Sequence, residues 1–380
     1  MGRLLDSSVD LAVVGAGVVG LAHAVHAVDR GLRVAVVERD AYPAGASVRN
    51  FGHGYVTAQS GDALDFALTS RELWLRLSAE AGFWAAETGT LLLARLPEEQ
   101  AVIEEFALVR GPDARLLSAT EALAKVPVSG DGLLGALWTA ADVRVDPRTA
   151  VPRIAKWLRD RGVTFHWQTA AMTVEPGRLS TSRGELEAEA IVLAAGHDLD
   201  LLVPDSATHA EIQRCTLQML RVAAPDDRRI EPGLATGLAL LRYSGFRICP
   251  SLTPLRERYL VERPELLELG VNLLIAQQPD GDLILGDTHR YGDTADPFRD
   301  EAADELLLRE GARLLGVDRL EVRERWLGVY AHAPGREFLV ATPCGRVRAV
   351  AVTSGIGMTT ALGLAERVLN DLLEPAALTA

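Results

Sequence analysis

Lysine is nearly absent from this chain: Lys125 and Lys156 are the only two in 380 residues, so arginine carries almost all of the positive charge. Cysteine is also scarce. Cys215, Cys249 and Cys344 are widely spaced and form no CxxC pair, which argues against a zinc knuckle or a redox dithiol. Sparse, odd-numbered cysteines are typical of a reducing compartment, so we expect a cytoplasmic protein.

Long apolar runs are absent as well. No stretch reaches the ~18 residues that a membrane-spanning helix needs, and the N-terminus lacks the pattern of a signal peptide. The histidines lack metal-ligand spacing, so no metal site is expected. A net charge of −13 argues against nucleic acid or an anionic membrane as partner. The length and the 48% hydrophobic content predict a globular protein of about two domains.

The apolar patterning predicts an α/β fold with an inserted β-rich part. Short apolar runs at 9–14, 33–38, 190–195 and 347–353 are typical of buried parallel strands. They are accompanied by helical patterns at 18–30, 62–81, 147–161, 300–315 and 359–373. The region after about Glu211 predicts strands separated by turns: Cys215–Val222, Phe246–Cys249, Val271–Gln277 and Asp282–Leu285. One sheet assembled from separated segments explains this order.

The first strand, helix and second strand form a βαβ unit with a glycine-rich turn. Gly15, Gly17 and Gly20 have the GxGxxG spacing, and Glu38 ends the next strand. The first glycine permits the tight turn, the second lets a pyrophosphate approach the backbone, and the third lets the helix pack on the sheet. The helix N-terminus then faces the phosphates, and Glu38 can accept hydrogen bonds from a ribose. This context predicts a dinucleotide site.

Several motifs occur in an order that resembles the D-amino-acid oxidase superfamily, which includes glycine oxidase and sarcosine oxidase. The resemblance covers almost the whole chain. Its segments are GAGVVG at 15–20, GASVRNFGHG at 45–54, VDPRTAVPRIAKWL at 145–158, IVLAAG at 191–196, QPDGDLILGD at 278–287, RWLGVYAHAPG at 325–335 and SGIGMTTALGLAE at 354–366. RNFGHG, TLQMLR and TSGIGMTTALGLAE look most similar to a bacterial branch associated with aminophosphonate metabolism.

The resemblance implies an FAD-binding Rossmann-like domain of the glutathione-reductase type and an inserted β-rich substrate domain. The FAD-binding domain would comprise 1–80, 142–210 and 316–380, and the substrate domain 81–141 and 211–315. The implied reaction moves a hydride from the carbon that bears a small amine to flavin N5, giving an imine that hydrolyses to a carbonyl. The amine would be an amino acid, an N-methyl amino acid or an aminophosphonate. Oxygen or another electron acceptor would be the second substrate.

The motifs also assign residues to the cofactor. Sarcosine oxidases attach FAD through a cysteine near the Trp-containing motif, but no cysteine occurs between 325 and 335, so we expect non-covalent FAD. The residues expected to contact FAD are Gly15, Ala16, Gly17, Val18, Val19, Gly20, Glu38, Arg39, Ser47, Asn50, Gly52, Ala195, Gly196, Gly355, Ile356, Gly357, Met358 and Thr359.

The substrate site departs from the pattern of α-amino-acid oxidases. An arginine often follows their Trp-x-Gly motif, whereas Tyr330 lies in this region here, and Met358 replaces a second arginine near the C-terminal glycines. Arg242, next to Tyr243, is therefore our candidate clamp for a carboxylate or phosphonate, because its forked donors match two oxygens. A surface position for Arg242 is the open alternative. Trp326 and Tyr330 are expected in the pocket from their motif position.

Three further points remain open at this stage. His53 follows the loop glycine and would either tune the flavin or the amine, or be held by the loop backbone. The LGDTH segment at 285–289 is similar to the GDxxH motif of flavin hydroxylases, but the polar residues that follow do not predict a helix. We therefore place Asp287 at a strand end in the substrate domain. A flavin-dependent monooxygenase and a catalytically silent flavin-binding protein are the alternative functions.

Overall fold

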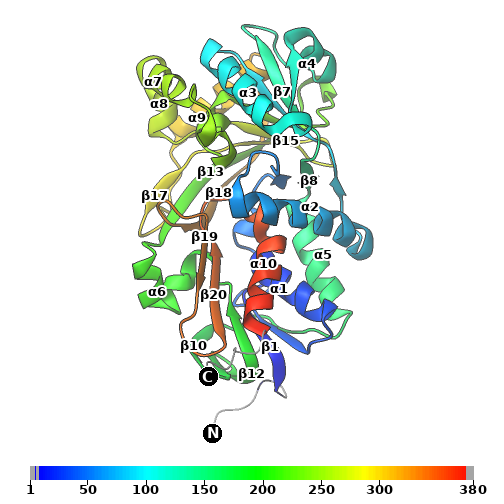
Figure 1. The fold of residues 1–380 in the computed structure, drawn as a ribbon, viewed down its shortest axis with the longest axis vertical. Helices are drawn as coiled ribbons and strands as arrows, with labels where there is room; N and C mark the ends of the chain where they lie inside the picture. The colour runs from blue at the N-terminus through cyan, green and yellow to red at the C-terminus, as the bar shows by residue number, and fades with distance from the viewer. Residues whose placement is uncertain (1–4, 6–7, 374–380) are drawn as a thin grey trace.

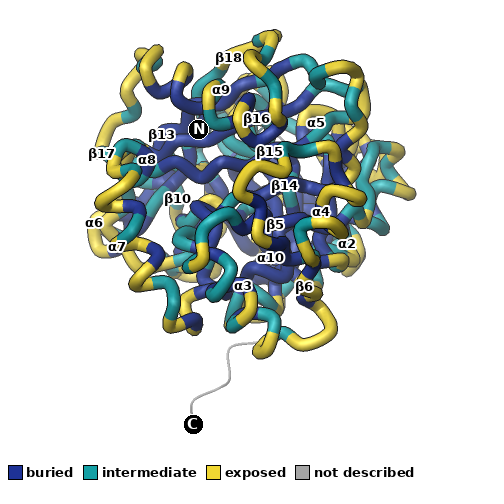
Figure 2. Tube along the Cα trace, turned by 90° about the horizontal axis from the view of Figure 1, so that it is seen from above, coloured by how far each residue is buried: buried dark blue, intermediate teal, exposed yellow. Residues whose placement is uncertain are grey.

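The computed structural model describes residue 5 and residues 8–373, and places them in two large sheets with helices around them (Figure 1). The strands that cross the interior are buried, whereas the outer helices and turns carry most of the exposed positions (Figure 2). Among the described residues, no helix is long and apolar enough to cross a membrane.

The first sheet has eight strands in the order β10-β11-β12-β1-β2-β9, with β20 beside β12 and β19 beside β20. Five of them run parallel: β1 (Val9–Val14), β2 (Val34–Val37), β9 (Thr164–His166), β12 (Gly184–Leu193) and β20 (Val347–Val352). The other three pair antiparallel: β10 (Ala171–Glu175), β11 (Arg178–Thr181) and β19 (Phe338–Ala341). The parallel strands predicted at 9–14, 33–38, 190–195 and 347–353 are confirmed, and their ends differ from the prediction by at most six residues.

Four helices cover one face of this sheet: α1 (Val18–Asp29), α2 (Gly61–Ala81), α5 (Pro147–Arg159) and α10 (Gly357–Leu373). Because side chains alternate along a strand, Leu11 and Val13 pack into the helix-covered core, while Ala12 and Val14 pack into the core of the opposite face. The opposite face is closed by β10–β11, the 3-10 segment η3 (Gly196–Leu201) and α6 (Pro204–His209). The central strand β1 is therefore buried on both faces.

The second sheet has nine strands in the order β17-β13-β16-β15-β14-β5-β7-β6, with β18 on the other side of β13. They are β5 (Thr90–Ala94), β6 (Arg115–Ser118), β7 (Gly135–Thr139), β13 (Gln213–Val222), β14 (Gly233–Thr236), β15 (Leu274–Gln277), β16 (Leu283–Gly286), β17 (Arg290–Gly292) and β18 (Val322–His332). A small third sheet joins β3 (His53–Gly54), β8 (Val143–Val145) and β4 (Ala85–Ala86).

Helices and 3-10 turns surround the second sheet. The helices are α3 (Pro97–Arg110), α4 (Ala119–Lys125), α7 (Leu252–Glu262), α8 (Pro264–Glu268) and α9 (Glu301–Leu315). The 3-10 segments elsewhere in the chain are η1 (Ala46–Val48), η2 (Gly111–Asp113), η4 (Pro225–Asp227), η5 (Gly237–Leu241) and η6 (Ser244–Ile248). The long strands β13 and β18 run down from this end of the molecule toward the first sheet (Figure 1).

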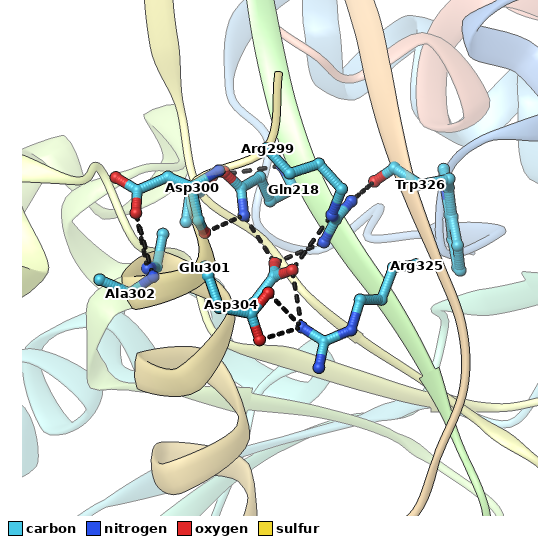
Figure 3. A network of polar contacts seen from close by, with 10 residues as sticks. Gln218, Arg299, Asp300, Glu301, Ala302, Asp304, Arg325 and Trp326 are labelled. Carbon is cyan, nitrogen blue, oxygen red and sulfur yellow. Dashed lines mark hydrogen bonds and ion pairs between the residues drawn. The ribbon is translucent and has the colours of Figure 1, made fainter. Parts of the chain in front are cut away.

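Helix α9 is tied to β13 and β18 by a buried ionic network (Figure 3). The carboxylate of Asp304 has no exposed surface, and it accepts hydrogen bonds from Gln218 Nε2 at 2.6 Å and from Arg325 Nη1 at 2.8 Å. Arg299 donates to the same carboxylate. These donors compensate the buried charge of Asp304. The network therefore holds α9 against β13 and β18.

One predicted element differs from the structure. The predicted strand Phe246–Cys249 is wrong: these residues lie in and just after η6, where Gly245 N donates to Ala58 O. A short apolar run is buried equally well in a strand or in a turn, so periodicity alone does not separate the two.

The predicted FAD-binding segment 316–380 also contains β18, which pairs with β13 in the second sheet over most of its length. The domain division therefore stays a prediction.

Candidate active site

A cavity of about 380 Å³ lies between the two sheets and begins where β1 ends. The chain connects β1 to β2 on one side, and the later strand β12 pairs on the other side. This reversal of strand order leaves a crevice at the carboxyl end of β1, where open α/β sheets bind their ligands. The cavity continues from there to β13 and β18 of the second sheet.

The β1–α1 turn forms one end of the cavity. Gly15 has φ +101°, and a Cβ at this position would lie 2.4 Å from Ala194 O, so no other side chain fits without moving the backbone. Helix α1 has no side-chain N-cap and no acidic residue in its first turn. Ser47 Oγ accepts from the first amide of the helix, Val18 N, and the partly positive N-terminus can still face an anion. These features fit the diphosphate of a dinucleotide.

Glu38 and Ser47 accept hydrogen bonds from backbone amides at the end of the cavity formed by the β1–α1 turn. Glu38 Oε2 accepts from Ala16 N at 2.8 Å, and its Oε1 accepts from Asp40 N at 2.9 Å. Ser47 Oγ accepts from Val18 N at 2.8 Å. The Glu38 carboxylate is therefore fixed on the cavity wall, where a ribose hydroxyl would reach it.

Most residues predicted to contact the cofactor line this cavity: Gly15, Gly17, Val18, Val19, Glu38, Arg39, Ser47, Asn50, Ala195, Gly196, Gly355, Ile356, Gly357, Met358 and Thr359. Ala16, Gly20 and Gly52 do not. Gly20 instead packs on the turn, since a Cβ there would lie 1.9 Å from Gly15 O. Gly52 packs against β8, since a Cβ there would lie 1.7 Å from Val145 O.

Arg242 lies at the other end of the cavity. Its Nη2 donates to Tyr330 Oη at 2.7 Å and to Ser354 O at 3.2 Å, and its Nη1 donates to Tyr291 Oη at 3.2 Å. These contacts use three of the five N–H groups of a guanidinium. The predicted residues Tyr243 and Tyr330 line the cavity beside it. The guanidinium is thus held in place with donors left for a ligand.

Asp287, Asn272 and His289 line the same end, and we did not predict any of them as site residues. The backbones of Asn272 and Asp287 exchange hydrogen bonds of 2.9 and 3.0 Å, which brings the end of β16 to the cavity. Asp287 is 5% exposed, and its Oδ1 has no hydrogen-bond partner in the part of the chain that the structure describes. Burial raises the pKa of this carboxyl to about 7, against the lowering effect of Arg242.

His289 and His53 line the cavity wall, and burial favours the neutral form of each ring. Burial and the nearby Arg242 lower the pKa of His289 well below its usual value, and its Nδ1 contacts Gly270 O at 2.7 Å. Burial, helped by Arg144, lowers the pKa of His53 to about 3. The His53 ring contacts Thr90 Oγ1 at 2.7 Å. The ring is therefore held by a side chain of β5 and not by the loop backbone, and a role of His53 toward the flavin or the amine stays a prediction.

Trp326 is not on the cavity wall. Its Nε1 donates to Arg49 O at 3.1 Å, and Arg148 lies over its ring at 4.9 Å. Trp326 and Tyr330 share one face of β18 because they are four residues apart, but that spacing corresponds to about 13 Å along a strand. Tyr330 reaches the cavity, and Trp326 lies beyond its end.

The position of Asp287 bears on the similarity of the LGDTH segment to the GDxxH motif of flavin hydroxylases. The expectation of a strand end without a following helix is confirmed, because β16 ends at Gly286 and the strand β17 begins at Arg290. The strand end faces the cavity from the second sheet, on the side of Arg242 and Tyr330. Asp287 therefore lines the cavity together with Arg242 and Tyr330.

The fold and the cavity define a flavin-dependent oxidoreductase, and comparison with known families agrees. The model of the FAD dependent oxidoreductase family matches residues 10–370, so the chain belongs to this family. Membership confirms the predicted cofactor, FAD, and the resemblance to the D-amino-acid oxidase superfamily.

Individual relatives are distant. The chain is 25% identical to a glycine oxidase of Bacillus licheniformis over 202 residues, 49% of this chain and 54% of the relative. It is 28% identical to a glycine oxidase of Geobacillus kaustophilus over 206 residues, again 49% of this chain and 54% of the relative. The matches thus span little more than half the length of these curated relatives. The crystal structure of glycine oxidase from Geobacillus kaustophilus shares the fold, with a TM-score of 0.79, 21% identity and coverage of 97% and 95%.

Proposed function

We propose that the protein oxidises a small amine that also carries an anionic group, an amino acid, N-methyl amino acid or aminophosphonate, with FAD as the electron acceptor. The observation that carries the proposal is a pair of opposite charges at the substrate end of the FAD cavity. Arg242 supplies the cation, and the buried carboxyl of Asp287, whose Oδ1 has no hydrogen-bond partner among the described residues, supplies the group for the amine. A zwitterion would satisfy both.

The roles of the side chains follow from their contacts. Arg242 binds the anionic group, and Tyr330 and Tyr291 hold its guanidinium through their hydroxyls. Asp287 binds the substrate ammonium and accepts its proton, because oxidation needs a free lone pair on nitrogen. When bound, FAD supplies the electron chemistry by accepting a hydride from the carbon beside that nitrogen. The imine product then hydrolyses to a carbonyl in water.

The apolar wall of the same cavity supports this mechanism. Leu217, Met219, Leu274 and Val329 line it together with the polar groups. Side chains of this kind exclude water and strengthen the electrostatic contacts made by Arg242 and Asp287. The cysteines do not line the cavity, which supports FAD held without a covalent bond through sulfur.

Anaerobic titration tests the proposal. Purified, FAD-loaded protein is mixed with glycine, sarcosine, D-amino acids, 2-aminoethylphosphonate and its N-methyl form, and flavin absorbance is followed. Bleaching by at least one anionic amine is the expected result. No bleaching by the whole panel would reject the proposal, and NADPH oxidation that depends on an aromatic substrate would favour a monooxygenase instead. Peroxide release compared with dye reduction then separates an oxidase from a dehydrogenase.

The pH dependence of Asp287 gives a second prediction. Its pKa is raised to about 7, so the carboxyl accepts a proton only above that pH, and kcat/KM should rise as pH increases through about 7 and then level off. In Asp287→Asn this rising limb should disappear, and kcat/KM at pH 8 should fall about 10²-fold or more. Asp282→Asn is the control, because Asp282 pairs with Arg221 outside the cavity. An unchanged pH profile in Asp287→Asn would remove this residue from the mechanism.

A further inference from the structure

Asn272 and Asp287 are neighbours on the wall at the substrate end of the cavity. They continue the antiparallel pairing of β15 and β16: Asn272 N donates to Asp287 O at 2.9 Å, and Asp287 N donates to Asn272 O at 3.0 Å. Two residues that exchange both backbone hydrogen bonds lie directly opposite each other, with Cα atoms about 5.5 Å apart. Their side chains can therefore both contact one small group in the cavity.

The side-chain oxygen of Asn272 is free to accept a hydrogen bond. Asn272 is 3% exposed, and its Oδ1 has no hydrogen-bond partner within the described part of the chain. Burial raises the pKa of Tyr243 to about 12, while Arg242 and a hydrogen bond with the Asn272 side chain act in the opposite direction. A hydrogen bond lowers the pKa of a phenol when it is donated to the phenol oxygen, so the amide nitrogen of Asn272 faces Tyr243. The amide oxygen remains for another donor.

Two free acceptors therefore lie side by side. Asp287 Oδ1 is buried as well and has no hydrogen-bond partner in residues 5 and 8–373. An ionised carboxylate and an amide oxygen accept hydrogen bonds and donate none, so neither binds the anionic group of a substrate. Buried acceptors normally have a donor, and this pair fits a ligand group with two N–H bonds. The ammonium group of the proposed substrate is such a donor.

We propose that Asn272 is a second ligand of the substrate amine and determines which amines react. This inference rests on the proposed function and specifies its substrate class as amines whose ammonium form has at least two N–H bonds. One N–H bond breaks as its proton passes to Asp287, an O–H bond forms on the carboxyl, and the electron pair stays on nitrogen. The other N–H stays hydrogen-bonded to Asn272 Oδ1 and holds the neutral amine in place for the loss of hydride to FAD.

The number of N–H bonds then separates the classes of amine. A primary ammonium has three and a singly N-alkylated one has two, so both can supply Asp287 and Asn272 together. A tertiary ammonium has one, which passes to Asp287 and leaves Asn272 without a donor. A site built to hydrogen-bond an N–H rejects the analogue that lacks it, because the buried polar group is left unpaired. The protein should therefore oxidise primary and secondary amines and reject tertiary ones.

Two isomeric amines test the inference on the FAD-loaded protein. N-ethylglycine and N,N-dimethylglycine contain the same atoms, but only the first has two N–H bonds as an ammonium; the same two forms of 2-aminoethylphosphonate make the comparison for a phosphonate. In steady-state kinetics, kcat/KM should be about 10- to 100-fold higher for the N-ethyl isomer. In Asn272→Leu this ratio should fall to about one, because the N-ethyl isomer loses a hydrogen bond that the other never makes. Where neither isomer reacts, their inhibition constants against the parent amine give the ratio.

Asn370→Leu is the control and should keep the original ratio, because Asn370 is exposed on α10 and accepts from Arg30 Nη2 outside the cavity. The ratio is taken within each variant, so a general loss of stability or of bound FAD does not change it.

The outcomes separate this inference from the proposed function. Equal values for the two isomers in the original protein, or an unchanged ratio in Asn272→Leu, overturn the role of Asn272 even if amines bleach the flavin. Weaker FAD binding in Asn272→Leu with an unchanged ratio assigns the amide to the cofactor and overturns the inference as well. No bleaching by glycine, by 2-aminoethylphosphonate or by their N-alkyl forms rejects the proposed function, and the role of Asn272 falls with it.

Discussion

Replacing Arg242 by alanine should lower kcat/KM for an anionic amine by about 10²- to 10³-fold while FAD remains bound. Truncating one partner of a hydrogen-bonded charge pair at a binding interface costs about 2–5 kcal/mol, and Arg242 is the cation that would pair with the substrate anion beside Asp287. Arg242→Lys should recover only part of the loss, because an ammonium keeps the charge and loses the forked geometry. Stopped-flow reduction of the flavin and steady-state kinetics measure the effect.

A structural effect of the same substitution must be separated from a binding effect. Arg242 also donates to Tyr330 and to Ser354 O, so its loss frees groups on the cavity wall. The absorbance of bound FAD and the melting temperature report such a change, and a neutral amine should react with both proteins at a similar rate. Arg309→Ala is the matched control, because Arg309 is exposed on α9. Equal losses for neutral and anionic amines would retire Arg242 as an anion clamp.

Most residues assigned to the cofactor line the cavity, and they could be found from the sequence because their signals are contiguous. The turn at Gly15, the uncapped start of α1 and the carboxylate of Glu38 all lie within one βαβ unit, so their spacing already determines their geometry. The parallel strands could also be predicted from the sequence, because strands buried on both faces form apolar runs.

The substrate end was predicted less completely because its residues come from separate strands. Asp287 and Asn272 meet through a backbone pairing between chain segments fifteen residues apart, and no local pattern encodes which end of β16 faces the cofactor. The LGDTH segment drew attention to Asp287 for a different reason, a similarity to flavin hydroxylases. Trp326 was placed in the pocket from its motif position, whereas the length of β18 carries it past the cavity.

Gly15→Ala should weaken FAD binding by at least about 100-fold, and the purified protein should be nearly colourless. The new Cβ would lie 2.4 Å from Ala194 O, a backbone atom of the β12 end, and φ is +101°. The strain costs about 1–2 kcal/mol, and the overlap moves the turn away from β12. The backbone amides at the start of α1 would then no longer converge on a bound diphosphate. FAD content by absorbance and titration of the apoprotein with FAD measure the change.

Gly31→Ala separates loss of the cofactor cradle from general destabilisation. Gly31 also has positive φ, at +75°, but a Cβ there meets nothing within 4 Å, so the substitution adds backbone strain without an overlap. Both variants should melt a few degrees lower, whereas only Gly15→Ala should lose FAD. If Gly15→Ala binds FAD as tightly as Gly31→Ala, the turn after β1 does not hold the diphosphate. The contacts that fix FAD would then lie elsewhere along the cavity, and the assignment of the Arg242 end to the substrate would lose its basis.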